Sequence, residues 1–459
     1  MKKISFMLCA AALMLASTFT SCTNEDNSIY ENNVVIRNGY YLNDIIADAI
    51  EKSTGNDIVV NLPDTIALRT KDYVEIPEGK NVSIIGKKGA PARVQLKYGF
   101  LADANLTIKN VEIDAQGLNS PIIAYAAENT DINFDGVTIK NNYNELVDWN
   151  ANGAKVTFTN SDISFNQIYS NAIVTIKDSK IKPYYTIFMG INDVIIENTE
   201  IDAENNWDPI FMLKYPYDLG FEGPNDKGYF VIEEPIVLKG IKVKNAKDAI
   251  FSEYAWWDEA KLVVKNFTID DCVFELNPME NKNFVISFNK GGILNFTIQN
   301  STVYNISEEY NFKYFMKWNE GNFPDKVGVE LNEGDVSVTY KDNTFYKIAS
   351  NWFVHTKRVA NAASKYDFDI ENNIWADCAV NQGGILRRLL SGKKTNQVHS
   401  AVVNGNTYLY HDADGNVKFE DASSYDKTEG QDIQNELQFA DPLNGDFHCG
   451  AQNGDPRWK

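Results

Sequence analysis

Three basic side chains stand at equivalent positions of strand-like segments in the C-terminal half of the chain, where they could act on an anionic polymer. Each segment begins with an aromatic or aliphatic residue, and aligning these beginnings places Lys317, His355 and Arg387 at a similar depth. Glu253 has the same place in an earlier segment. A cation neutralises a carboxylate, a lysine or histidine removes the proton beside it, and an arginine steadies the resulting enolate. The set therefore favours β-elimination on a uronic-acid glycan.

Aromatic residues near these segments are the predicted glycan-binding residues, because aromatic rings contact the apolar faces of sugars. Residues two apart on a strand share a face, so Lys357 joins His355. The alternative interpretation of each single charged residue is a solvated side chain on an outer face. The predicted binding residues are Tyr254, Trp256, Trp257, Trp318, Trp352 and Lys357.

Paired carboxylates would provide a competing chemistry, the hydrolysis of a glycosidic bond. Asp148, Glu253 and Asp258 are available, but the pattern has little specificity because the chain holds 63 acidic residues. The elimination hypothesis includes a Ca²⁺ ion held by nearby carboxylates. Three functions therefore stay open: a glycan-binding protein without catalysis, a polysaccharide lyase, and a structural or adhesive surface protein whose face has no groove.

A repeated six-residue phrase must position these segments. The phrase is apolar, any, Asn/Asp/Gly, any, any, apolar, and it occurs eleven times. Asn, Asp and Gly tolerate a left-handed backbone, so each phrase predicts a strand, one left-handed residue and a new strand in another direction. A repeated corner predicts an all-β solenoid, the parallel β-helix, with corner side chains hydrogen-bonding along the stack. The third positions are Asn110, Gly136, Asn160, Asp178, Asn198, Gly240, Asp271, Asn300, Asp342, Asn372 and Gly405.

The solenoid is predicted over residues 39–410, with a cap at each end. An amphipathic helix over 43–52, with Asn43 as its N-cap, would cover the first rung, because terminal rungs need capping. A turn-rich segment over 411–459 would close the last rung. Two intervals between corners, from Asn198 to Gly240 and from Asn300 to Asp342, are each 42 residues long and must contain excursion loops. Such loops usually build the site on a solenoid.

The first 21 residues predict a targeting segment rather than part of the fold. Lys2 and Lys3 precede an apolar stretch, and Ser21-Cys22 follows small residues, as in a loose bacterial lipobox. Cleavage before Cys22 would leave its thiol to carry lipid, with residues 22–38 as a polar tether. The alternative is a plain secretory signal with an incidental cysteine. The acidic stretch after Cys22 resembles the signal for export to the outer face of the outer membrane.

The formal charge of −20 argues against binding to nucleic acid or to anionic lipid. Membrane attachment is therefore expected through the N-terminal lipid only, and the protein is expected to be a monomer that binds polysaccharide. Cys272, Cys378 and Cys449 are widely spaced and predict neither a disulfide framework nor a zinc site.

The corner phrase and the N-terminal helix resemble the pectate-lyase-like right-handed β-helix superfamily. The tail, Asp441–Phe447 and Gly454–Trp458, is similar to the tails of uncharacterised Bacteroidetes surface lipoproteins linked to polysaccharide utilisation. The resemblance implies a right-handed helix and a connection to glycans. It implies no single activity, because this fold hosts lyases, hydrolases, esterases and non-enzymes. The Gly-His-Gly of polygalacturonases and the Arg-x-Pro-x-x-Arg of pectate lyases are absent.

Overall fold

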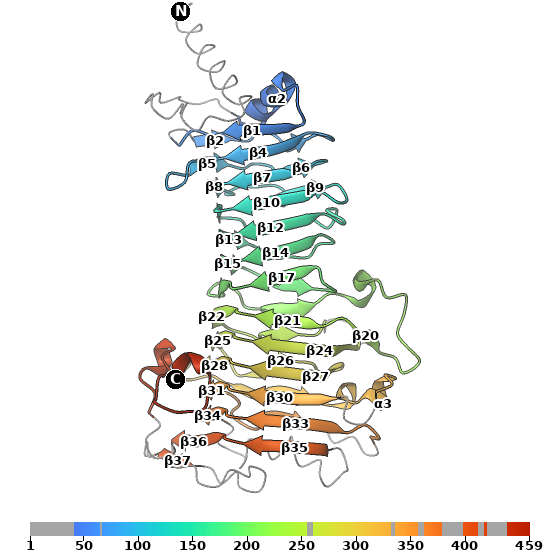
Figure 1. Ribbon diagram of the computed structural model, residues 1–459, viewed down its shortest axis with the longest axis vertical. Helices are drawn as coiled ribbons and strands as arrows, with labels where there is room; N and C mark the ends of the chain where they lie inside the picture. Colours follow the sequence, from blue (N-terminus) through green and yellow to red (C-terminus); the bar gives the residue numbers. More distant parts are fainter. Residues whose placement is uncertain are drawn as a thin grey trace, which may run out of the picture. The chain divides into compact units, whose positions relative to one another are not determined.

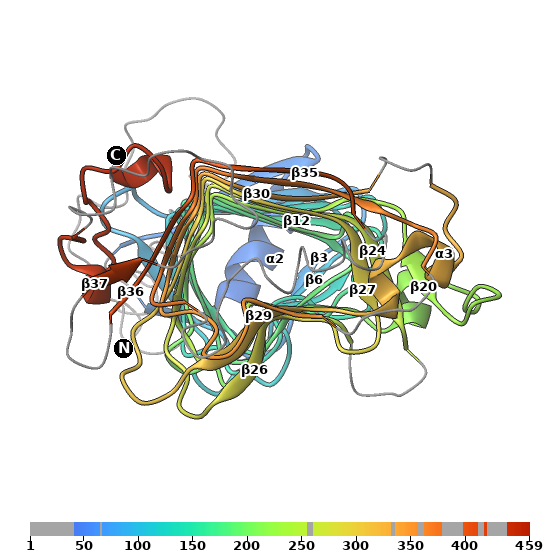
Figure 2. The ribbon, with the colours of Figure 1, turned by 90° about the horizontal axis from the view of Figure 1, so that it is seen from below.

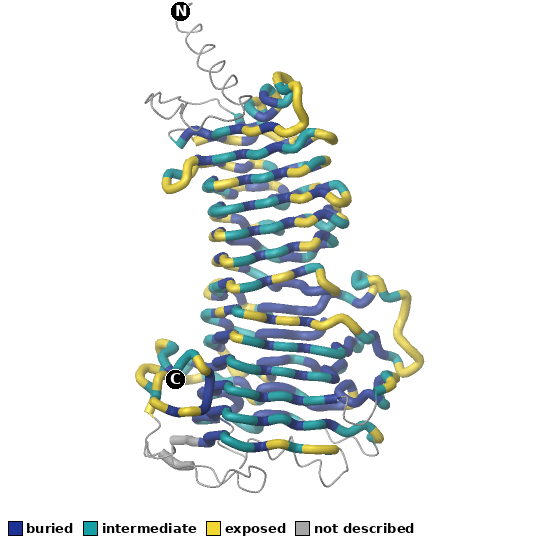
Figure 3. Tube along the Cα trace, viewed as in Figure 1, coloured by how far each residue is buried: buried dark blue, intermediate teal, exposed yellow. Residues whose placement is uncertain are grey.

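The fold is a right-handed parallel β-helix, as the repeat and the resemblance predict. The computed structural model describes residues 41–64, 67–254, 260–331, 336–356, 362–378, 398–411, 417–419 and 438–459. These belong to two compact units, the first formed by Met1–Tyr184 and Asp193–Thr199, the second by Tyr185–Asn192 and Glu200–Lys459. In each unit the strands stack rung on rung in parallel (Figure 1). Buried and less buried positions alternate along the strands (Figure 3), which fills the interior of each stack with apolar side chains.

Three parallel sheets run along the first unit. Its first sheet holds β1 (Asp57–Asn61), β4 (Asn81–Ile85), β7 (Leu106–Lys109), β10 (Asp131–Asp135), β12 (Lys155–Thr159), β14 (Ile173–Lys177) and β17 (Val194–Glu197). Its second sheet holds β2 (Ala67–Arg69), β5 (Ala92–Gln95), β8 (Val111–Asp114), β11 (Thr138–Lys140), β13 (Asp162–Phe165) and β15 (Lys180–Pro183). Its third sheet holds β3 (Val74–Ile76), β6 (Phe100–Ala102) and β9 (Ile123–Ala126).

Three sheets also run along the second unit. Its first sheet holds β21 (Ile236–Lys239), β24 (Leu262–Asp270), β27 (Gly292–Gln299), β30 (Ser337–Lys341), β33 (Tyr366–Glu371) and β35 (Val398–Asn404), with β20 (Phe230–Ile232) beside β24. Its second sheet holds β18 (Glu200–Asp202), β22 (Lys242–Ala246), β25 (Val273–Leu276), β28 (Thr302–Asn305), β31 (Thr344–Tyr346), β34 (Ile374–Ala376), β36 (Thr407–His411) and the antiparallel β37 (Val417–Phe419). Its third sheet holds β16 (Ile187–Met189), β19 (Phe211–Leu213), β23 (Phe251–Ser252), β26 (Lys282–Ser287), β29 (Phe312–Trp318) and β32 (Val354–Thr356).

Every corner phrase turns the chain from a first-sheet strand to a second-sheet strand through one left-handed residue. The third position has a positive φ in all eleven phrases, between +48° at Asn198 and +67° at Gly405. Only Gly, Asn and Asp adopt this backbone readily, which explains the restriction on residue type. Some third-position side chains also bond to the preceding rung, as Asn198 does to Asp178 at 3.3 Å and Asn300 to Asp270 at 3.0 Å.

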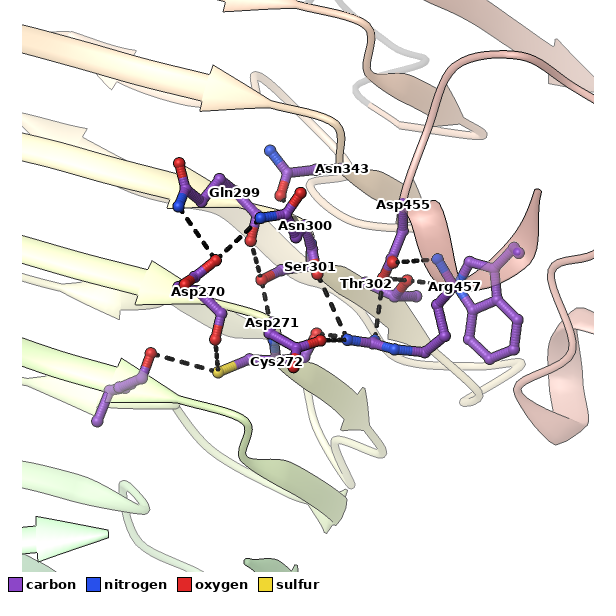
Figure 4. A network of polar contacts seen from close by, with 12 residues as sticks. Asp270, Asp271, Cys272, Gln299, Asn300, Ser301, Thr302, Asn343, Asp455 and Arg457 are labelled. Atoms are coloured by element: carbon purple, nitrogen blue, oxygen red, sulfur yellow. Dashed lines mark hydrogen bonds and ion pairs between the residues drawn. The ribbon is translucent and has the colours of Figure 1, made fainter. Parts of the chain in front are cut away.

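A more continuous ladder lies at the fourth position of the phrase, which the sequence analysis did not single out. From Cys272 onward, the backbone N–H of each fourth residue donates to the side-chain oxygen of the next fourth residue. The distances are 3.1 Å from Cys272 to Ser301, 3.1 Å from Ser301 to Asn343, 3.1 Å from Asn343 to Asn373 and 3.0 Å from Asn373 to Asn406. All five residues are buried. Figure 4 shows the first three of them inside the corner.

The predicted N-terminal helix is α2 (Leu42–Lys52), which packs against β1 and β3 at the first rung of the first unit. Figure 2 shows it across the end of that stack. The predicted N-cap was wrong: Tyr41 is the N-cap residue, and Asn43 lies inside the first turn. The Asn43 side chain instead accepts from Lys71 N and donates to the carbonyl oxygens of Asp72 and Tyr73. Among the described residues, no helix has the length and apolar character needed to cross a bilayer.

The tail, residues 438–459 with η6 (Pro442–Asn444) and η7 (Pro456–Trp458), lies on the outer face of the second sheet of the second unit. At one end of the tail, Arg457 donates a hydrogen bond to Asp271 (Figure 4). At the other end, the Asn453 amide donates to the carbonyl oxygen of Gly405. The tail therefore contacts five successive rungs along their side, whereas the sequence predicted a segment that closes the last rung. The remaining part of that predicted cap lies largely outside the described residues.

Both 42-residue intervals contain the predicted excursions. The first carries η2 (Pro216–Leu219) and β20, and the second carries η3 (Glu320–Asn322) and α3 (Pro324–Val327). The two excursions touch, since the Asn225 amide donates to Val327 O at 2.7 Å. A buried cluster that includes Tyr229 and Val327 joins them.

Candidate functional site

The candidate site lies on the outer face of the third sheet of the second unit, over β26, β29 and β32. Phe315 and Met316 are adjacent in the chain, yet both are buried at 1% exposure. The residues on either side of this pair, Tyr314 and Lys317, are therefore both left on the outer, half-buried face. The same arrangement recurs in the next rung, where Phe353 and Val354 are buried between Trp352 and His355.

Lys317 and His355 are register partners on the neighbouring parallel strands β29 and β32. Partners in adjacent strands lie about 4.8 Å apart along the sheet, so the two side chains leave the same face side by side. The ammonium group of Lys317 donates to the carbonyl oxygen of Asn289 at 2.9 Å. The structure therefore brings together two of the three predicted catalytic residues. The third, Arg387, lies outside the described residues.

Glu253 does not belong to this column. Phe251 pairs with Ile286 and Ser252 with Ser287, so Ser252 stands in the Ser287 column and Glu253 one position further. The sequence alignment of this segment was wrong by one residue, because its inward apolar pair is Ile250 and Phe251, both fully buried. Glu253 itself is 0% exposed and points away from the outer face.

Aromatic rings surround His355 on the outer face. The ring centroids of Tyr314 and His355 are 4.7 Å apart, and those of Trp352 and His355 are 5.9 Å apart. Phe284 stacks on Tyr314 at 5.3 Å, and Tyr314 lies 6.0 Å from Trp352. Phe284 is 8% exposed, so the rings of Tyr314 and Trp352 form a continuous apolar floor over it rather than separate stacking faces.

Tyr314 and Phe284 were missed by the sequence analysis. Strict alternation places residues three apart on opposite faces, so Tyr314 would not share a face with Lys317. The signal that could have found it is the adjacent apolar pair Phe315-Met316, which recurs as Val285-Ile286 and Phe353-Val354. Such a pair marks a local break in the alternation of each rung.

Two predicted glycan-binding residues are core residues instead. Trp318 is 5% exposed and packs on Tyr366 with ring centroids 4.7 Å apart. Tyr254 is 8% exposed and lies 5.2 Å from Tyr215 of the first excursion. Burial, together with the carboxylate of Asp218, raises the pKa of the Tyr254 phenol. Trp352 is the one predicted aromatic residue that the structure describes at the site. Trp256, Trp257, Lys357, Asp258 and Cys22 lie outside the described residues.

Carboxylates line the edge of the site beside β23 and β26. The Lys282 ammonium contacts Asp248 at 2.8 Å and Glu280 at 2.9 Å. Burial lowers the pKa of Lys282, but its hydrogen bonds to these two carboxylates outweigh that effect and the net pKa is raised. Burial, then the nearby charge of Asp248, raises the pKa of Asp208.

The carboxylates considered for hydrolysis do not form a described pair. Asp148 belongs to the first unit, where it accepts hydrogen bonds from Asn150, while Glu253 is buried in the second unit. Within the described ranges, no group of three or more His, Cys, Asp and Glu side chains is placed to hold a metal ion. The described residues therefore offer no such carboxylate group for the Ca²⁺ ion of the elimination hypothesis.

A pocket of about 430 Å³ lies between the two excursions. Phe221, Asn225 and Tyr229 line one side, and Gly328, Val329 and Glu330 line the other. A Cβ at Gly328, which has a φ of +78°, would lie 3.0 Å from the Lys227 side chain, so glycine suits this close approach. The second unit therefore has a hollow between its excursions rather than a flat face there.

No family model and no curated protein matches this chain. Among solved structures, a mutant of a PL6 family alginate lyase, AlyGC, is similar over 84% of this chain and 55% of that one, with 12% identity and a TM-score of 0.32. The chain thus spans about half the length of that structure. At this identity and TM-score, the similarity does not identify a shared activity.

Proposed function

We propose that this protein binds an acidic polysaccharide on the outer face of β26, β29 and β32 and cleaves it by β-elimination. The observation that carries the proposal is the pairing of Lys317 with His355 on adjacent strands, with the ring of Tyr314 beside the imidazole. Together they can supply the three roles used in elimination from a uronate: a cation for the carboxylate, a base for the proton beside it and a proton donor for the departing oxygen.

The chemistry needs no water and no oxidant. The Lys317 ammonium pairs with the uronate carboxylate and stabilises the charge that develops when the adjacent C5 proton is removed. The neutral imidazole of His355 takes that proton. The freed electron pair forms the C4–C5 double bond as the bond from C4 to the glycosidic oxygen breaks. The Tyr314 hydroxyl donates its proton to the departing oxygen, which leaves an unsaturated uronate at one new end and a hydroxyl at the other.

Glycan binding without catalysis is the second candidate, and the apolar floor favours it. Tyr314 and Trp352, whose rings lie 6.0 Å apart, form an apolar surface over the buried ring of Phe284, and this surface would contact a sugar chain without any proton transfer. The pocket between the excursions argues against the flat face expected of a structural or adhesive protein.

The test is absorbance at about 232–235 nm, where unsaturated uronates absorb, with the soluble chain from Thr23 incubated with a panel of acidic polysaccharides. Lys317→Ala and His355→Ala should each lower the rate by about 100-fold or more, since each removes a group needed in the transition state. Lys239→Ala and His399→Ala, on the first sheet of the same unit, should retain the wild-type rate.

Absence of any absorbance change, together with retarded migration in a gel containing the glycan, would overturn elimination and leave the binding function. Absence of both signals would overturn both candidates.

We also propose, from the sequence pattern, that the protein is a lipoprotein anchored through Cys22 and exposed on the outer membrane. Cys22→Ser should abolish incorporation of labelled palmitate and release the protein from the membrane fraction of an expressing bacterium. Protease digestion of intact cells tests the exposure, because a chain on the inner leaflet would be protected.

A further inference from the structure

We infer that Glu253 is a positioning residue for the proposed site, because its buried carboxylate holds the turn that presents the Asn289 carbonyl to the Lys317 ammonium. The inference rests on the proposed function. It assigns a role to a buried acidic group that takes no part in the chemistry described above.

Three consecutive backbone N–H groups converge on this one carboxylate. Oε1 accepts from Asn289 N at 2.5 Å and from Lys290 N at 2.8 Å, and Oε2 accepts from Gly291 N at 2.7 Å. Successive N–H groups in a turn form a concave anion site, and here the protein fills it with its own side chain. The geometry defines the path of the chain from Asn289 to Gly291, immediately after β26.

The same turn is enclosed by backbone on both sides. A Cβ at Gly291 would lie 1.6 Å from Leu262 O, and a Cβ at Gly321 would lie 2.1 Å from Gly291 O. Glycine is therefore required at both positions, and successive turns pack at backbone contact. The turn cannot shift without disturbing the rungs on either side of it.

The turn also accepts hydrogen bonds from the next rung. The carbonyl oxygen of Asn289 accepts from Lys317 Nζ at 2.9 Å and from Asn319 Nδ2 at 3.3 Å. Since Lys317 is the register partner of His355, the position of this carbonyl affects where the ammonium lies relative to the imidazole. Hydrogen bonds thus connect Glu253 on one rung to the turn on the second rung, and that turn to Lys317 on the third rung.

Only a carboxylate can satisfy all three donors in this geometry. The amide of a glutamine has a single acceptor oxygen, and its NH₂ group would face a backbone N–H. Glu253→Gln should therefore displace the turn and weaken the hydrogen bond from Lys317 to the Asn289 carbonyl oxygen. The value of kcat/KM should fall by about 10- to 100-fold, as small misplacements of catalytic groups do. Glu275→Gln is the matched control, because Glu275 accepts from Tyr304 and Asn245 on the second sheet, away from the site.

A double-mutant cycle separates positioning from a general loss of structure. If Glu253 acts through Lys317, the double variant with Lys317→Ala should be no slower than Lys317→Ala alone, and the pH–rate profile of Glu253→Gln should move in the same direction as that of Lys317→Ala. If Glu253→Gln fails to fold, Glu253→Asp keeps two acceptor oxygens and takes its place in the cycle.

Additive losses in the cycle, or a wild-type rate in Glu253→Gln, would overturn the inference while the proposed function stands. A wild-type rate in Lys317→Ala would overturn the proposed function itself. The two failures are therefore distinguishable in one set of measurements.

Discussion

The hydroxyl of Thr302 donates a 2.6 Å hydrogen bond to the carboxylate of Asp455, and this contact ties the tail to the second sheet across 153 residues of chain. Asp455 is 1% exposed and also accepts from Arg457 at 3.0 Å. Phe447, 1% exposed, packs on Tyr304 in the apolar cluster beneath the tail. The tail is thus an integral part of the second unit.

Replacement of Asp455 should loosen the tail. Asp455→Ala leaves the Thr302 hydroxyl and the Arg457 guanidinium without their shared acceptor, so the free energy of unfolding should fall by about 1–3 kcal/mol. Urea denaturation monitored by tryptophan fluorescence measures this free energy of unfolding. Asp441→Ala is the control, because Asp441 makes an exposed side-chain hydrogen bond to Asn444 within the same tail. An equal loss in both variants would contradict the specific role of Asp455.

The third and fourth positions of the corner phrase should respond differently to substitution. Asn373 is fully buried, accepts from Asn343 Nδ2 at 2.8 Å and donates to Asn406 Oδ1 at 2.9 Å. Asn373→Ala breaks the ladder in two places and should cost about 2–4 kcal/mol. Asn372→Gly, at the left-handed third position with φ of +56°, should change stability by only a few tenths of a kcal/mol.

Thermal unfolding of both variants checks the contrast between the two positions. A small effect of Asn373→Ala would show that the ladder satisfies buried polar groups without adding stability.

Removal of the Tyr314 hydroxyl should separate catalysis from binding. Tyr314→Phe keeps the ring that contacts Phe284 and His355, so glycan affinity in gel migration should stay the same. The rate of unsaturated product formation should fall by about 100-fold, because the departing oxygen loses its proton donor. Tyr217→Phe, at an exposed tyrosine of the first excursion, is the control. An unchanged rate in Tyr314→Phe would exclude this residue as the acid.

Glu253 should make stability depend on pH. Burial raises its pKa, and the three backbone N–H donors from Gly291, Lys290 and Asn289 offset part of that effect. Because burial of the charge raises the pKa in the folded state, the folded protein is favoured most when Glu253 is protonated, and this pH-dependent part of the stability is fully present below the ordinary glutamate pKa of about 4.3. It is lost as pH rises through the folded pKa.

Relative to Glu253→Gln, the wild-type free energy of unfolding should therefore decrease as pH rises above about 4.3. Urea denaturation at a series of pH values from about 4 to 7 measures the difference. Glu78→Gln, at an exposed glutamate, should run parallel to the wild type. A difference between wild type and Glu253→Gln that grows with pH in favour of the wild type would contradict the raised pKa.

The sequence by itself determined the corners and hence the fold. A positive φ is a property of one residue and its immediate neighbours, so Asn, Asp and Gly at a fixed place in a repeat predict the turn wherever it occurs. All eleven corners, the N-terminal helix and the two excursions were predictable on this local basis. The equivalence of the two segments that carry Lys317 and His355 was also predictable, because both segments begin with an aromatic residue.

Only the tertiary structure decided which side chains reach the site. The direction of a side chain depends on where the alternation breaks, and the apolar pair Phe315-Met316 turns Tyr314 outward and Trp318 inward. The register of neighbouring rungs placed Ser252, and not Glu253, in the outer column. The position of the tail depends on a contact between residues distant in sequence, Thr302 and Asp455. The position of the turn that binds Lys317 depends likewise on the contact of Glu253 with Gly291. No local preference encodes such contacts, because they exist only once the rungs are stacked.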